Sequence, residues 1–174
     1  MKSKFVSRKE LAALDFYDST FKNIEIFFSD GNSRGCKIQI DFYDWEGNQA
    51  KRETDSSSEW TWKALTITFG YLAHFEYSMP DLMNRAQDIY ELQFDHELER
   101  LRAIEEKQRQ EFPKRQSPLF DTESEALSLK FVSENEDEEN QGYILVIGSD
   151  VTLEWGGFDS YVGQTHFPID DDLR

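Results

Sequence analysis

The chain has 174 residues, with 35 acidic side chains against 19 basic ones, and its formal net charge is −16. This length suffices for one domain with its own core, so we expect a single domain over residues 1–174. Cys36 is the only cysteine, which excludes an internal disulfide or a zinc ribbon and favours a reducing compartment. No apolar run is long enough for a signal peptide or a membrane span, so we expect a cytoplasmic protein with no membrane contact.

The acidic surplus bears on the kind of partner. A net negative field repels phosphate backbones, so the charge argues against nucleic-acid binding. The same field attracts a basic protein, although acidic composition is also a common route to solubility. Aromatic residues make up 14% of the chain, which indicates that the charge is carried by a folded domain.

The first half of the chain predicts three strands, with a short helix possible at the N-terminus. Residues 21–45 contain two alternating apolar runs around a loop, which is typical of a β-hairpin. A third strand is predicted over 60–70, where the apolar residues alternate with threonines. The side chains expected to face the core are Ile38, Ile40, Phe42, Leu65, Ile67 and Phe69.

A long helix is predicted over about 80–111. Pro80 suits its first turn, acidic residues lie near its start and basic residues near its end. Its narrow apolar stripe would pack across the sheet or against a second copy of the chain, so the sequence leaves a monomer and a helix-mediated homodimer open.

The rest of the chain predicts three more strands, over 126–132, 142–148 and 151–158. We expect a surface linker over 113–125, an acidic loop over 133–142 and a flexible tail over 168–174. The predicted fold is therefore α+β: an antiparallel sheet of about six strands with one long inserted helix.

No motif in the sequence predicts catalysis. Cys36 and the histidines His74, His96 and His166 lack the local context of a nucleophile and its base. His96 begins the spacing of a zinc-binding helix, but residue 100 is Arg where a second histidine is needed. We therefore expect no enzyme, no catalytic residue, no metal and no cofactor.

The segment DFYDWEGN, residues 41–48, gathers three carboxylates around three rings. The strand period places Asp41, Tyr43 and Trp45 on one side, and Asp44 and Glu46 on the other as the chain enters a turn at 47–48. Three convergent carboxylates, as a metal or acid–base site requires, are therefore not expected.

Four rings are predicted to share the face of the sheet opposite the core. The same period places Trp60 and Trp62 on that side of the third strand, beside Tyr43 and Trp45. Either the long helix covers these rings as a second small core, or part of the face stays open. In the open case the rings and the carboxylates around them would anchor a protein partner.

Four segments carry a family resemblance: FYDSTFKNIEIFF, KIQIDFYDWEGN, TWKALTITF and GYILVIGSDVTLEWGGFDSYV. They resemble small, sheet-rich, uncharacterised bacterial proteins of the toxin-immunity type. Tyr17-Asp18-Ser19 stands where those proteins have His-Asp-Ala or His-Asp-Ser. The resemblance covers about two thirds of the chain, omits the predicted long helix, and implies a protein that neutralises a toxin.

The sequence thus favours a non-enzymatic acidic protein-binding module whose partner is basic, for example a toxin. The predicted binding residues are Asp41, Tyr43, Asp44, Trp45, Glu46, Trp60 and Trp62. Two alternatives remain: a nucleic-acid mimic that inhibits a nuclease or defence protein, and an enzyme with a carboxylate cluster.

Overall fold

The computed structural model describes residues 4–28, 33–57, 60–78, 88–115, 117, 119–133 and 142–156, together with the backbone of 161–162. Within these ranges the helices are α1 (Arg8–Ala12), α2 (Trp45–Thr54) and α3 (Leu98–Glu111). The strands are β1 (Ser19–Phe28), β2 (Arg34–Tyr43), β3 (Thr61–Ser78), β4 (Asp88–Phe94), β5 (Leu127–Ser133), β6 (Tyr143–Trp155) and the short β7 (Tyr161–Val162).

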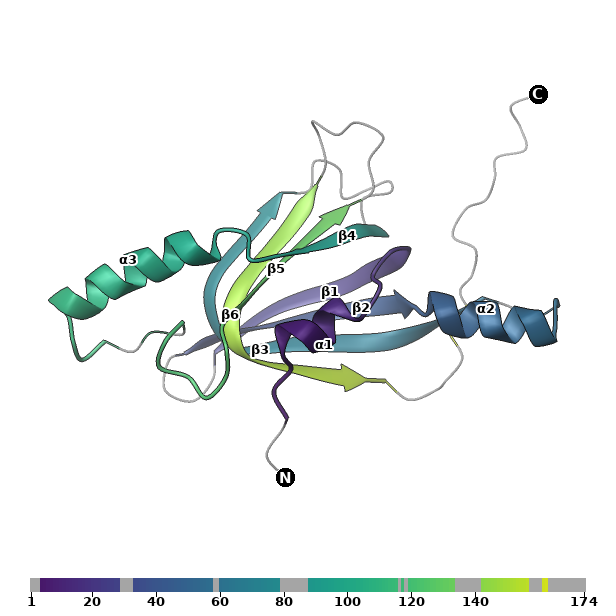
Figure 1. The fold of residues 1–174 in the computed structure, drawn as a ribbon, viewed down its shortest axis with the longest axis horizontal. Coiled ribbons are helices and arrows are strands. Elements are labelled where there is room, and N and C mark those ends of the chain that lie inside the picture. The colour runs from purple at the N-terminus through teal and green to yellow at the C-terminus, as the bar shows by residue number, and fades with distance from the viewer. Residues whose placement is uncertain are drawn as a thin grey trace.

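Six antiparallel strands form a sheet that closes on itself, and the short β7 pairs with the first residues of β3 (Figure 1). The order β2-β1-β4-β5-β6-β3 returns to its start, because β2 pairs with both β1 and β3. Among the described residues, the junction between β1 and β4 consists of Ser19 opposite Ile89 and Thr20 opposite Asp88. The predicted α+β class and antiparallel six-stranded sheet are confirmed.

The predicted hairpin is also present. β1 and β2 are antiparallel, and β2 continues the sheet into β3 with an unbroken register from Cys36 opposite Phe69 to Tyr43 opposite Trp62. The core-facing residues expected in β2 and β3 are all buried. The end of β1, in contrast, is not buried, because its last residue, Phe28, is 73% exposed.

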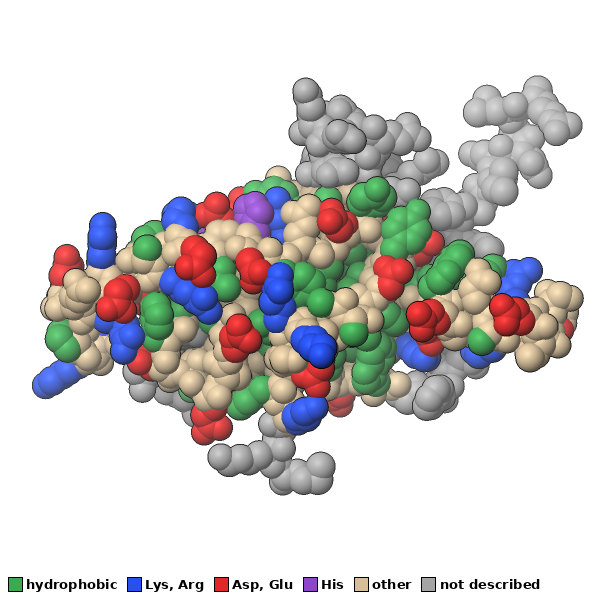
Figure 2. Space-filling view, in the orientation of Figure 1, with side chains coloured by type: hydrophobic (Ala, Val, Ile, Leu, Met, Phe, Trp, Pro, Cys, Tyr) green, Lys and Arg blue, Asp and Glu red, His purple; other side chains and the backbone are tan. Residues whose placement is uncertain are grey.

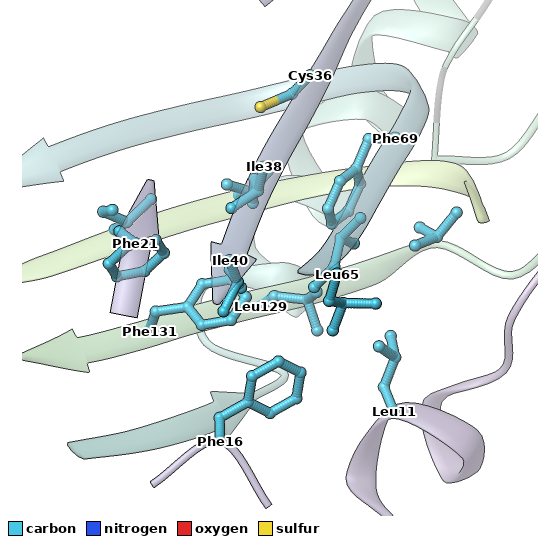
Figure 3. Close-up of a cluster of buried hydrophobic side chains, with 14 of the residues drawn as sticks. Leu11, Phe16, Phe21, Cys36, Ile38, Ile40, Leu65, Phe69, Leu129 and Phe131 are labelled. Carbon is cyan, nitrogen blue, oxygen red and sulfur yellow. The ribbon is translucent and has the colours of Figure 1, made fainter. Parts of the chain in front are cut away.

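The main core fills the interior of the closed sheet. Figure 3 shows Phe16, Phe21 and Phe131 among the aliphatic side chains of β2, β3 and β5, and Phe131 contacts both other rings edge to face. Helix α1 adds Leu11, which is fully buried. A capping box between Ser7 and Glu10 fixes the start of this short helix, so the predicted N-terminal helix is present.

The long helix predicted over about 80–111 is wrong in its described part. Residues 88–94 form β4, which pairs with β5, and only 98–111 are helical. Ile89 of β4 is buried in the main core. Asp95 and Glu97, both with positive φ, turn the chain between strand and helix. Residues 80–87 lie outside the described residues.

Two further predictions need correction. The strands expected over 142–148 and 151–158 are one strand, β6, which continues through Asp150 at positive φ. Gly148 permits the close approach of β3 to this strand, because a Cβ there would overlap the Tyr71 carbonyl oxygen. The turn expected at 47–48 is wrong, since those residues lie in the first turns of α2.

The segment 113–125 is anchored as well as exposed. Lys114 and Arg115 are exposed, whereas Ser117 and Leu119 are buried. Leu119 packs with Leu98 of α3 in a second small core against β6. Of the predicted acidic loop, residues 134–141 lie outside the described residues, as does the predicted tail at 168–174. No helix among the described ranges is both long enough and apolar enough to span a membrane.

Candidate functional site

Four aromatic rings lie together where β2 ends and β3 begins. Tyr43 lies at the centre, with ring centroids 5.8 Å from Trp45, 5.9 Å from Trp60 and 5.2 Å from Trp62. Trp45 and Trp60 are nearly parallel, at 13° and 6.2 Å between centroids. We call these four residues the aromatic cluster. The expectation that they share one face agrees with this geometry, and their role in binding stays a prediction.

The strand period brings these rings together. Tyr43 is directly opposite Trp62 in the β2–β3 register, on the face away from Phe42 and Leu65. Trp60 precedes the first residue of β3, and Trp45 is the first residue of α2. The chain therefore leaves the sheet after β2 and re-enters it at β3 in the same place, and the four rings lie together there.

The aromatic cluster is covered unevenly. Tyr43 is 6% exposed, Trp60 and Trp62 are half-buried, and Trp45 is 45% exposed. The neighbouring helix is α2, whereas α3 lies at the other end of the molecule (Figure 1). Hydrophobic side chains reach the surface beside the start of α2 (Figure 2). The inner part of the cluster is thus a small core, and Trp45 is its open part.

Asn48 joins α2 to the start of β3. Its side chain is buried, donates to the Thr61 carbonyl at 2.9 Å, and accepts from the Thr61 amide and hydroxyl, each at 3.1 Å. Lys51 adds a hydrogen bond from Nζ to the Thr61 hydroxyl at 3.1 Å. These contacts hold Trp45 and Trp60 at a fixed spacing, which a surface site requires if it is to be preorganised.

Two of the three predicted carboxylates are already paired within the chain. Asp41 forms an ion pair with Lys22 at 2.7 Å. Asp44 pairs with Lys63 and accepts from the Gly47 amide at 3.0 Å, which makes it the N-cap of α2. The hydrogen bond from Lys63 holds the pKa of Asp44 below its ordinary value, so the group is ionised at neutral pH. Glu46 is exposed in the first turn of α2.

Charged groups also border the rings. The Arg52 guanidinium lies over the Trp60 ring, 4.4 Å from its centroid. Burial raises the pKa of Tyr43, and the charge of Asp18 adds to that shift. The Trp62 indole donates to the Asp18 carbonyl at 3.5 Å. The site therefore already contains one arginine side chain stacked on an indole ring.

A second group of polar side chains was not found from the sequence. On the outer face of β3, β5 and β6, Glu76 accepts from Tyr143 and lies 3.4 Å from His74. Lys130 lies 3.3 Å from His96 Nε2 and 4.6 Å from the Tyr143 ring centroid. The spacing of His74 and Glu76 by two residues would have placed them on one face, but β3 was expected to end at residue 70. His166 lies outside the described residues.

Cys36, the one cysteine of the sequence, is buried in β2. Burial raises the pKa of Cys36 to about 11, so its thiol is protonated at neutral pH. Among the described residues, no three His, Cys, Asp or Glu side chains are arranged to hold a metal ion.

Comparison with known proteins gave no match to a protein-family model, to a curated protein or to a solved structure.

Proposed function

We propose that this chain is a non-enzymatic, acidic protein-binding module that neutralises a basic partner in the cytoplasm, such as a toxin. The observation that carries the proposal is the aromatic cluster, in which a rigid core of three rings supports the exposed Trp45. Tryptophan and tyrosine at the centre of an interface supply most of the binding energy in many complexes.

The preorganised support favours binding through Trp45. Asn48 and Asp44 fix the start of α2, and Trp60 stacks against the Trp45 indole. A side chain that is already ordered loses little conformational entropy when a partner covers it. Little of the free energy gained by burying the exposed part of Trp45 would therefore be lost in ordering its side chain.

The carboxylates have separate roles in this proposal. Asp41 and Asp44 are held in ion pairs with Lys22 and Lys63, so their main contribution is to position the surface. Glu46, exposed beside Trp45, forms the charged rim that meets basic side chains of the partner. The net charge of −16 then accelerates encounter over a longer range.

Co-expression with the basic products of neighbouring genes tests the proposal. A toxic neighbour should lose its toxicity in the presence of this chain, and the purified pair should bind directly. Trp45→Ala should weaken binding by about 2 kcal/mol, the size expected for an anchor residue. Trp155→Ala is the matched control, since Trp155 is similarly exposed, at 43%, on β6 outside the cluster.

The proposal is wrong if no neighbouring product binds or is neutralised. It is also wrong in its choice of surface if Trp45→Ala and Trp155→Ala retain equal affinity while both remain folded.

A further inference from the structure

Trp60 contacts two residues of α2, Trp45 at its first position and Arg52 in its last turn, and the three side chains form a short stack beside this helix. The Arg52 guanidinium lies 4.4 Å from the Trp60 ring centroid, and Trp60 is nearly parallel to Trp45. A planar cation over an indole is attracted by the negative face of the ring. This chain therefore already contains one example of guanidinium recognition by the aromatic cluster.

Trp45, the other ring of this group, is partly exposed to solvent. Trp45 has ring contacts with Tyr43 and Trp60 on the inner side, and 45% of the residue remains exposed. Trp60 has a cation on it, whereas no Lys or Arg of the described residues lies over Trp45. The exposed part of the Trp45 indole is thus the place where one more planar group can extend the stack.

The charges around Trp45 select a cationic group. Glu46, the next residue, is exposed and forms no ion pair within the described ranges. Asp44, the preceding residue, is ionised but pairs with Lys63, so Glu46 is the carboxylate next to Trp45 that is left for a partner, and the whole chain carries −16. Arginine suits such a position better than lysine, because its flat guanidinium can stack on the ring and donate to a carboxylate at the same time.

We propose that Trp45 binds an arginine side chain of the partner, which continues the stack of Arg52, Trp60 and Trp45, and that Glu46 accepts a hydrogen bond from that arginine. This inference rests on the proposed function, which it makes more specific. The partner is then a basic protein that presents an exposed arginine at the centre of its contact surface.

The test uses blocked tri-arginine and tri-lysine peptides, which have equal charge. The chain has four tryptophans, and each gives one indole N–H signal in a nitrogen-15 NMR spectrum. We expect tri-arginine to shift the Trp45 signal most, and tri-lysine to shift it several-fold less at the same concentration. The Trp155 signal should stay unchanged with both peptides.

Two variants refine the assignment. Trp45→Leu should reduce tri-arginine affinity about two- to fivefold, as expected for one exposed cation–π contact, while the control Trp155→Leu keeps it. Arg52→Gln removes the internal guanidinium from Trp60, so the peptide should then shift the Trp60 signal as well.

Equal shifts with the two peptides, or no loss in folded Trp45→Leu, would overturn the inference. If a partner still binds in a Trp45-dependent manner, the proposed function stands and only the arginine assignment fails. If tri-arginine shows the expected selectivity but no neighbouring product binds, the arginine site stands and the proposed function fails.

Discussion

Asp44 has two roles at the junction of β2 and α2. Its carboxylate accepts from the Gly47 amide and so begins α2, and it also pairs with Lys63 at the start of β3. An N-cap satisfies a backbone amide that the helix itself leaves without a partner. One side chain therefore fixes the helix that carries Trp45 and ties it to the neighbouring strand.

Replacing Asp44 should separate these roles. Asp44→Ala removes both the cap and the charge pair, and should destabilise the fold by about 0.5–2 kcal/mol. Asp44→Asn keeps a capping oxygen and should lose less, because exposed ion pairs contribute little. Urea unfolding measures the difference, with Glu46→Gln as the control. Equal losses in Asp44→Asn and Asp44→Ala would show that the cap contributes nothing.

The same pair predicts a pH dependence. The pKa of Asp44 in the folded chain lies below its ordinary value of 3.8, mainly because of the Lys63 hydrogen bond. A depressed pKa contributes stability above pH 3.8, and this contribution is lost as the pH falls through the folded value. The stability gap between the wild type and Asp44→Asn should therefore narrow under acidic conditions, as acid-titrated urea unfolding would measure. A constant gap would contradict the pairing.

Cys36 should be unreactive in the folded protein. Burial raises its pKa from 9.0 to about 11, which lowers the thiolate fraction at neutral pH about a hundredfold. Iodoacetamide should label the chain only after unfolding in urea, as mass spectrometry would detect. Rapid labelling of the native chain would show that β2 opens to solvent.

Among the elements, the sequence was sufficient to predict those strands in which apolar and polar residues alternate. The β1–β2 hairpin and the buried faces of β2 and β3 follow directly from the period of two. That period also identified the aromatic cluster, since Tyr43 and Trp62 lie on the face opposite the core.

Elements that depend on contacts with distant parts of the chain were not predicted from the sequence. The segment over 88–94 has helix-compatible spacing, but pairing with β5 and burial of Ile89 make it a strand. Helix α2 contains Gly47 and Asn48, which favour a turn, yet Asn48 is held by Thr61 thirteen residues away. The ion pairs of Asp41 and Asp44 likewise depend on lysines of neighbouring strands.

The docking of α2 on β3 should depend on Asn48. Asn48→Ala leaves the Thr61 amide and carbonyl without these partners, so we expect a loss of about 1–3 kcal/mol. Near-ultraviolet circular dichroism should also weaken as Trp45 and Trp60 lose their fixed geometry. The control is Gln49→Ala at the exposed neighbouring position. Similar spectra and stabilities in both variants would mean that α2 is held by other contacts.

At the scale of the whole molecule, charge and rings act over different distances. In the function that we propose, the net charge of −16 attracts a basic partner from beyond the contact surface, whereas the aromatic cluster acts only after contact. Acidic and basic side chains are interspersed on the face seen in Figure 2, so the local field at the rings depends on nearby residues such as Glu46.

Because the charge acts at long range and the rings act only in contact, we expect them to affect different rate constants of partner binding, association and dissociation respectively. Raising the salt concentration from roughly 50 to 500 mM should slow association and leave dissociation nearly unchanged. Trp45→Ala should instead speed dissociation, because it removes a contact made in the complex. Surface plasmon resonance measures both constants. An association rate independent of salt would contradict electrostatic steering.

The contact surface that we propose is the aromatic cluster, and hydrogen–deuterium exchange of the complex is the measurement that tests this claim. With a neutralised partner bound, amides of α2 and of the first residues of β3 should gain protection, while those of α3 should not change. Protection confined to α3, or to the outer face around His74 and Lys130, would contradict the claim.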